Sequence, residues 1–374
     1  MTVKRLPPAL ALFLLAPLVG EYLLGNIPLD VWAPVAFPPT ALLYGCGAVL
    51  IREVVTRAGG GWLMTLLLAI TYGIIEEALV TQSLFNQNYL GLGLGAYGDV
   101  PALGISVPWS VYVLSIHSVW SIFVPIVMVE TLYADRYGRP WLRARGLVAN
   151  ALGYVVGAVI LFSAMYLNEA NDGFLLSALQ LIGTVVVVAV LIILAFLSRP
   201  SRPSRGPGRA AQTSRRAWSP VALGAFALAA GTALFLLFEF GPDRKALSEP
   251  ATWVLLSVLV TVVLVVIVGN TRAADWSHRH VYALAAGAVL TYCWVGFMVQ
   301  ITQYGFRLIP TIIQILLVAG AVSLIVIASR SVDAFGSAVA LGITGESGNT
   351  DKLESTVTSG DIGEPSPESV DETE

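Results

Sequence analysis

The chain has 374 residues, of which 56% are hydrophobic and only 12% are charged. A soluble domain carries about 25% charged residues, so this composition excludes a soluble enzyme and predicts a protein that crosses a membrane several times. The net charge of −3 combines two opposite parts. From Ser331 onward there are ten acidic residues and one lysine, whereas the preceding part has 20 basic and 14 acidic residues.

Ten apolar segments are long enough to cross a bilayer, since a transmembrane helix needs about 20 mostly apolar residues. We therefore expect an all-α, polytopic membrane helix bundle with about ten transmembrane helices, a multi-pass protein of the cell membrane. The expected spans are residues 7–25, 35–56, 62–83, 107–132, 146–167, 174–197, 219–240, 251–269, 280–300 and 308–329.

The basic residues before Ser331 are distributed unequally between the two sides of the membrane on which alternate connections lie. One set of connections, together with the residues flanking the first and last spans, holds 17 Lys and Arg, and the other set holds three. Lys and Arg resist translocation, so the richer side is predicted to be cytoplasmic. Both termini are then expected in the cytoplasm.

Composition also divides the chain into four parts. Residues 1–197 form a six-span region with the main polar cluster, and residues 219–330 form a four-span region. Between them, residues 198–218 are rich in Arg, Pro, Ser and Gly, which predicts a flexible basic cytoplasmic linker. Residues 331–374 are rich in acidic and small polar residues, which predicts a disordered cytoplasmic tail.

The third expected span carries two adjacent carboxylates, Glu76 and Glu77. An acidic side chain near the middle of a span costs about 2.5–3.5 kcal/mol, so such residues usually mark a functional path. Consecutive helical residues point about 100° apart, so we expect one glutamate to face a polar site and the other to pair with a neighbouring helix. Glu21, close to the end of the first span, is expected to have a boundary role.

Depth places a histidine near the acidic pair. Glu76 lies about 10 Å below the outer end of its span, and His117 lies about 14 Å below the same face in the next span. We expect the two to meet in the outer half of the bilayer, in a polar cavity open to the outer side. The candidate catalytic residues are Glu76, Glu77 and His117, and the candidate substrate- or ion-binding residues are Glu76, Glu77, Thr81, Tyr72 and Ser121.

The acidic pair and the histidine resemble motifs of the CAAX-protease and bacteriocin-processing family of intramembrane peptidases. That family carries Glu-Glu-x-x-x-Arg on one span, Phe-x-x-x-His on a later one and His-x-x-x-Asn on a third. Here Glu76-Glu77 matches the first motif with Thr81 in place of the Arg, and His117 matches the second with Val113 in place of the Phe. The third motif has no counterpart, and the resemblance covers about 60 residues.

The resemblance implies that Glu76 or Glu77 acts as general base on a water molecule, while His117 holds a metal ion or stabilises an oxyanion. The missing residues imply a relative without peptidase activity. From the residues alone we favour a transporter or permease with Glu76 and Glu77 as a proton or cation site. An intramembrane metallopeptidase-like protein, active or inactive, and a membrane scaffold or accessory subunit remain as alternatives.

The lipid bilayer is the one partner that the sequence predicts. The substrate, whether an ion, a small molecule or a peptide, stays open, and so do any cofactor and any metal. Nucleotide-binding Walker motifs are absent from the sequence, and no nucleic-acid partner is expected.

Overall fold

The computed structural model describes residues 6–199, 216–243 and 245–340. In this part of the chain, nine helices are long and apolar enough to cross a membrane, and a shorter apolar helix covers Pro8–Leu23. These ten segments coincide with the ten expected spans to within a few residues at each end. The polytopic helical bundle is confirmed.

Several spans of the N-terminal half are built from α-helix interrupted by π-helix. Such a π-helical turn continues the span but changes the direction of the side chains that follow it. The elements are α1 (Pro8–Pro17), η1 (Leu18–Leu23), α2 (Ala33–Thr40), η2 (Ala41–Gly45), α3 (Cys46–Ala58), α4 (Trp62–Ile75), η3 (Glu76–Val80), α5 (Val107–Ser115), η6 (Ile116–Phe123) and α6 (Val124–Leu132).

From residue 144 onward the described part of the chain is made of longer continuous helices. They are α7 (Ala144–Tyr166), α8 (Ala178–Leu197), α9 (Pro220–Phe238) with the π-helical turn η9 (Glu239–Asp243), α10 (Glu249–Thr271), α11 (His278–Tyr304) and α12 (Leu308–Ala340). The connections contain 3₁₀ turns η4 (Tyr89–Gly91), η5 (Leu94–Ala96), η7 (Ala134–Arg136) and η8 (Glu169–Asn171), and one antiparallel hairpin of β1 (Asp99–Val100) and β2 (Ile105–Ser106).

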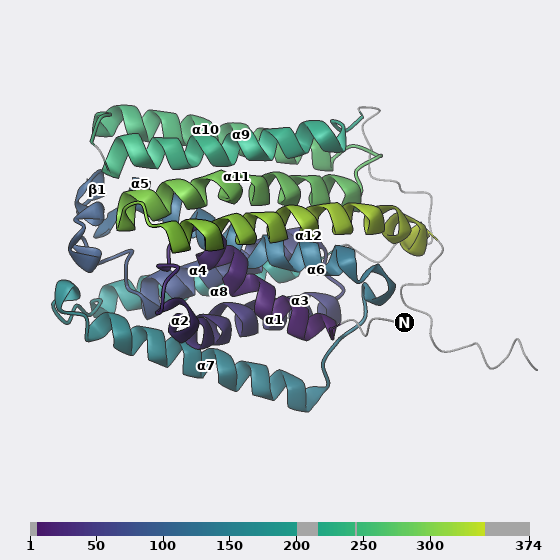
Figure 1. The fold of residues 1–374 in the computed structure, drawn as a ribbon, viewed down its shortest axis with the longest axis horizontal. Coiled ribbons are helices and arrows are strands. Elements are labelled where there is room, and N and C mark those ends of the chain that lie inside the picture. The colour runs from purple at the N-terminus through teal and green to yellow at the C-terminus, as the bar shows by residue number, and fades with distance from the viewer. Residues whose placement is uncertain (1–5, 200–215, 244, 341–374) are drawn as a thin grey trace, which may run out of the picture.

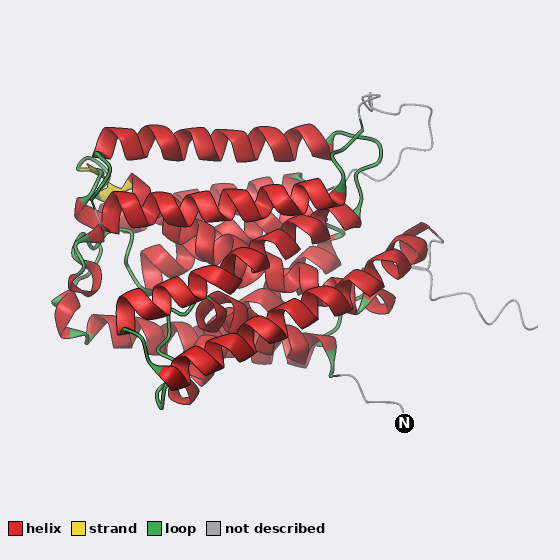
Figure 2. Cartoon of the chain, turned by 45° about the horizontal axis from the view of Figure 1, so that its top comes forward, coloured by secondary structure: helices red, strands yellow, loops and turns green. Residues whose placement is uncertain are grey.

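The helices lie roughly side by side, with α9 and α10 along one edge of the bundle and α7 along the opposite edge (Figure 1). The small hairpin caps one end, as Figure 2 shows. The most buried of these nine spans is Val107–Leu132. Of an 18-residue apolar stretch in each span, 72% is buried inside the protein for Val107–Leu132, against 6% for α7 and 11% for α8, α10 and α12. In a bilayer these four helices therefore face lipid, and the polar side chains of the central spans are shielded from it.

Helix ends follow local sequence signals. Ser219 accepts a hydrogen bond from the Ala222 amide, and Pro220 begins α9 where no amide donor is needed. Ser177 and Gln180 form a reciprocal capping box at the start of α8. Helix α3 ends at Ala58 and is capped by Gly59, whose φ of +66° is the left-handed conformation that favours glycine.

The expected linker and tail fall mostly on residues 200–215 and 341–374, outside the described part. The end of the linker is held in place: the Ala217 amide donates to Asp275 Oδ1 at 2.8 Å and the Trp218 amide donates to Asn270 Oδ1 at 2.6 Å. Helix α12 continues to Ala340, beyond the expected boundary at residue 330.

Candidate functional site

Four π-helical segments meet at one place inside the bundle. Segment η1 contributes Glu21, η2 contributes Tyr44, η3 contributes Glu76 and Glu77, and η6 contributes His117. None of these five residues is more than 7% exposed. Because π-helix is rare and occurs mostly as single turns at functional sites, its presence in all four segments sets this polar cluster apart from the rest of the fold.

The imidazole of His117 lies between the two adjacent glutamates. Its Nδ1 is 3.2 Å from Glu76 Oε2, and its Nε2 is 3.0 Å from Glu77 Oε1. The expectation that only one glutamate faces the site is wrong. Helix α4 ends at Ile75 and a π-helical turn begins at Glu76, so the 100° step of an α-helix does not apply, and the ring offers nitrogen atoms on two sides.

Tyr44 joins a third carboxylate to this group. Its hydroxyl is 2.6 Å from Glu21 Oε1, contacts Glu76 Oε1 at hydrogen-bond distance, and lies 3.4 Å from His117 Nδ1. Glu21 thus belongs to the cluster, and the boundary role expected for it is wrong. Its position near the end of a span concealed this, because the fold brings η1 and η2 together around the same point.

The remaining candidate residues lie around the same cluster. Thr81 donates to Glu77 Oε2 at 2.9 Å, and Ser121 Oγ is 3.5 Å from His117 Nδ1. Tyr72 packs its ring against Tyr44 with centroids 6.1 Å apart, and its buried hydroxyl has no hydrogen-bond partner among the described residues. The structure therefore brings together all six residues named from the sequence.

Hydrogen-bond chemistry limits how many protons the cluster holds. A neutral imidazole has one donor and one acceptor nitrogen, and an imidazolium has two donors. With a carboxylate oxygen at each nitrogen, either the ring of His117 is doubly protonated, or it is neutral and Glu76 or Glu77 carries the second proton. Both arrangements place two protons on the three groups and leave a formal charge of −1.

The Tyr44 hydroxyl has one proton and contacts two carboxylates, so a carboxyl proton is needed in one of those contacts as well. Glu76 Oε2 is buried and has no aligned hydrogen bond, which leaves its 3.2 Å contact with the His117 ring as its nearest compensation. Burying an uncompensated carboxylate is costly, and this favours a shared proton or a bound cation at this point.

The five residues of the cluster are buried in the conformation described, and a polar cavity open to the outer side stays a prediction. A hydrogen bond links the cluster to an exposed side chain at the protein surface. The exposed side chain of Asn26 donates to Glu21 Oε2 at 2.8 Å. At the other end of the cluster, Ser83 contacts Glu77 Oε2 at hydrogen-bond distance, and the indole of Trp109 donates to Ser83.

Tyr44 and Ser83 were missed by sequence reasoning. Tyr44 stands in an apolar run and carries no charge, although Pro38-Pro39, shortly before it in the same span, indicate a break in the regular helix. Ser83 is the last residue of the third expected span and gives no signal by itself. Both join the cluster through contacts between separate segments, which no local pattern predicts.

The three candidate catalytic residues have the donor atoms of a metal site. Glu76, Glu77 and His117 each offer one ligand atom, and these atoms lie within 4.8 Å of one another. Two carboxylates and an imidazole are a common ligand set for zinc and related divalent metals. These three residues are therefore suitable ligands for a divalent metal, with one restriction. His117 can give a metal only one nitrogen, and the carboxylate at its other nitrogen then orients the ring.

Comparison with known proteins places the chain by family. No curated protein and no solved structure matches it. The sequence model of a family described as an uncharacterised membrane protein family matches residues 10–343, which begins within the first span and includes the other spans and the whole polar cluster. The chain belongs to this membrane protein family.

Proposed function

We propose that this protein is a proton-coupled membrane transporter in which Glu76, Glu77 and His117 form the proton-binding site. The observation that carries the proposal is the chain of polar contacts from Glu21 through Tyr44 and Glu76 to His117 and Glu77. Each neighbour in this chain can exchange a proton with the next, and the groups must share protons to be buried at all.

Two further features support transport over a purely structural role. The lipid-facing spans surround a central set of polar side chains, which is the place where transporters bind ions and substrates. Glu76, Glu77 and His117 together hold two protons whether the imidazole is doubly protonated or one glutamate carries the second proton. A proton can therefore move across the ring without a change in the charge of the three residues. A motion that opens the cluster to one side would then load or release a proton.

The proposal is tested in liposomes containing the purified protein and an internal pH-sensitive dye. A pH gradient is imposed, and amino acids, organic amines and sugars are added in turn. We expect one class of compound to trigger a proton flux that is lost in Glu77→Gln and retained in the presence of a chelator. Glu169→Gln, an exposed acidic residue in a connection, is the matched control.

A second candidate is a metal-dependent intramembrane hydrolase, favoured by the ligand geometry of Glu76, Glu77 and His117 and by the resemblance to the CAAX-protease family. The same preparation separates the two functions. Stoichiometric metal in the purified protein, with peptide cleavage that a chelator abolishes and no compound-triggered proton flux, supports the hydrolase and overturns the transporter.

A further inference from the structure

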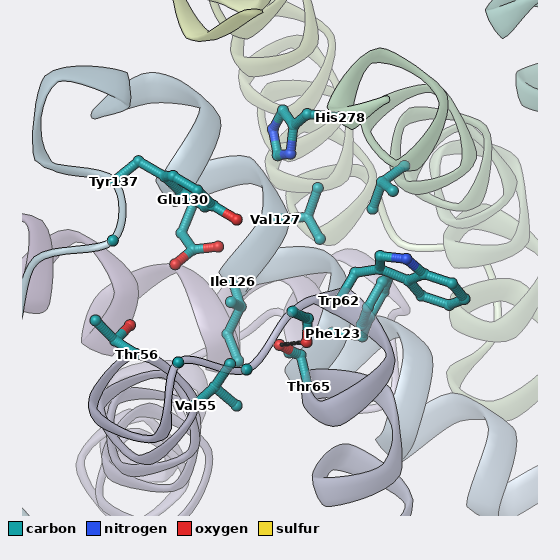
Figure 3. Close-up of a pocket in the computed structure, with 15 residues that line it drawn as sticks. Val55, Thr56, Trp62, Thr65, Phe123, Ile126, Val127, Glu130, Tyr137 and His278 are labelled. Atoms are coloured by element: carbon teal, nitrogen blue, oxygen red, sulfur yellow. Dashed lines mark hydrogen bonds between the residues drawn. The ribbon is translucent and has the colours of Figure 1, made fainter. Parts of the chain in front are cut away.

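A pocket of about 260 Å³ lies between α3, α4, α6 and α11, and Figure 3 shows the residues that line it. It lies where α3 ends and α4 begins, whereas the cluster starts where α4 ends. The 14 residues of α4 correspond to about 21 Å of helix, so the pocket and the cluster are separate sites. The pocket is about as polar as it is apolar, with Glu130 at one side and Trp62 and Phe123 at the other.

Glu130 is the anionic side chain of this pocket. Its Oε1 accepts a hydrogen bond from Arg52 Nε at 3.1 Å, and its Oε2 has no partner among the described residues. The Glu130 side chain is 17% exposed, while Arg52 and Glu53 behind it are fully buried. Glu130 Oε2 is thus the atom of this ion network that can accept a hydrogen bond from a molecule in the pocket.

The two neighbouring arginines bind protein groups and do not line the pocket, although Arg52 Nη2 is buried without a hydrogen-bond partner among the described residues. Arg52 donates from Nη1 to Glu53 Oε1 at 3.1 Å and to the Arg139 carbonyl at 2.8 Å, and its guanidinium covers the Trp141 ring at 3.6 Å. Arg57 donates to Glu53 Oε2 and to the Leu142 carbonyl. Neither arginine lines the pocket, and together with Glu53 and Glu130 they form a group of zero formal charge.

The other titratable groups that line the pocket are Tyr137 and His278, whose rings lie with centroids 6.1 Å apart. Burial, together with the nearby carboxylate of Glu130, raises the pKa of Tyr137 to about 12, so its hydroxyl is neutral at physiological pH. The Nε2 of His278 is 2.7 Å from Thr131 Oγ1. Glu130 is therefore the one acidic side chain that lines the described pocket.

The aromatic residues and the volume of the pocket limit the class of ligand further. Trp62, Phe123 and Tyr137 present ring surfaces, and aromatic faces attract cations. A volume of about 260 Å³ is below the range of about 300–1,000 Å³ typical of pockets for drug-sized ligands, so the occupant is small. Hydrocarbon atoms of such a ligand would contact Ile126 and Val127 at the base.

We propose that this pocket binds a small organic cation, whose ammonium group is held by Glu130 Oε2 and whose hydrocarbon part lies against Trp62, Phe123 and Val127. The proposal is independent of the proton site, because it uses none of the residues of the polar cluster.

The test is calorimetric titration of the full chain in nanodiscs of uncharged phosphatidylcholine, with empty nanodiscs as the blank. Three probes of similar size are compared: n-propylammonium, propan-1-ol and propionate. We expect the ammonium probe to bind at least about tenfold more tightly than either of the others, a difference of about 1.4 kcal/mol. Because this comparison uses the unaltered protein, it does not depend on the folding of a variant.

Glu130→Gln then locates the binding. Its amide oxygen still accepts from Arg52, and we expect the ammonium probe to bind at least about tenfold more weakly, whereas Glu249→Gln, an exposed acid at the start of α10, leaves binding unchanged. Equal binding of the alcohol, tighter binding of propionate, the absence of binding at millimolar propylammonium, or unchanged binding in Glu130→Gln would each overturn the proposal.

Discussion

The phenol ring of Tyr44 stacks on the imidazole of His117, with centroids 5.8 Å and planes 11° apart, while its hydroxyl contacts Glu21 and Glu76. One side chain from η2 therefore links carboxylates of η1 and η3 to the histidine of η6. This contact makes a single site from four segments that are separate in the sequence, and it is the point at which the site is most easily tested.

Tyr44→Phe keeps the stacked ring and removes the hydroxyl. The loss leaves one buried carboxylate oxygen without a donor and one carboxyl proton without an acceptor, which costs about 1–3 kcal/mol of stability, and it interrupts the proton path between Glu21 and Glu76. We expect compound-triggered proton flux in liposomes to fall at least about tenfold while the variant still folds. Flux at the wild-type level in a folded Tyr44→Phe protein would show that Glu21 and Tyr44 are outside the path.

His117→Gln removes the group that separates the two adjacent glutamates. Breaking a buried ion pair by removing one partner costs about 3–5 kcal/mol, because the remaining charges stay buried, and we expect a loss of this size in the free energy of unfolding. The double variant His117→Gln, Glu77→Gln should regain part of it, since one carboxylate is then neutral. Unfolding in mixed micelles is measured for His117→Gln, for Glu77→Gln and for the double variant, and purely additive losses would contradict direct coupling.

Arg52→Lys tests the ion network beside the pocket. The guanidinium reaches Glu130, Glu53 and the Arg139 carbonyl at once, and an ammonium cannot reproduce this planar geometry. We expect a loss of about 3 kcal/mol and faster proteolysis of the connection at residues 133–143. Arg57→Lys is the matched control: the Arg57 side chain is 41% exposed, so its pair should contribute less than about 1 kcal/mol.

The contact between the linker end and the α10–α11 connection should depend on pH. The hydrogen bond from the Ala217 amide lowers the pKa of Asp275 below its usual value of 3.8. A carboxyl with a lowered pKa in the folded state stabilises that state above its unfolded pKa, and the contribution is lost as the pH falls through the folded pKa.

We therefore expect the protection of the Ala217 amide against hydrogen exchange, corrected for intrinsic rates, to hold at neutral pH and to fall below about pH 4. Asp275→Ala should remove this protection at every pH. An Ala217 amide that exchanges equally slowly in Asp275→Ala would show that the contact does not hold the linker.

Local patterns predicted the parts of the site that lie on one helix. Thr81 and Ser121 each follow a site residue by four positions, and Tyr72 precedes one by four, so helical spacing alone placed them beside Glu77, His117 and Glu76. Depth within a span also predicted that Glu76 and His117 meet, because the constant rise per residue of a helix gives the depth of each residue in the bilayer. These expectations needed no knowledge of which helices are neighbours.

Sequence by itself determined the class of this protein, its spans and the level of its polar pair, because hydropathy and helical rise are properties of each segment alone. Which helices lie together depends on packing between distant segments, and only the tertiary structure decided it. That packing brought Glu21 and Tyr44 to the acidic pair through four π-helical turns, set both glutamates against one imidazole, and left the Glu130 pocket at the opposite end of α4.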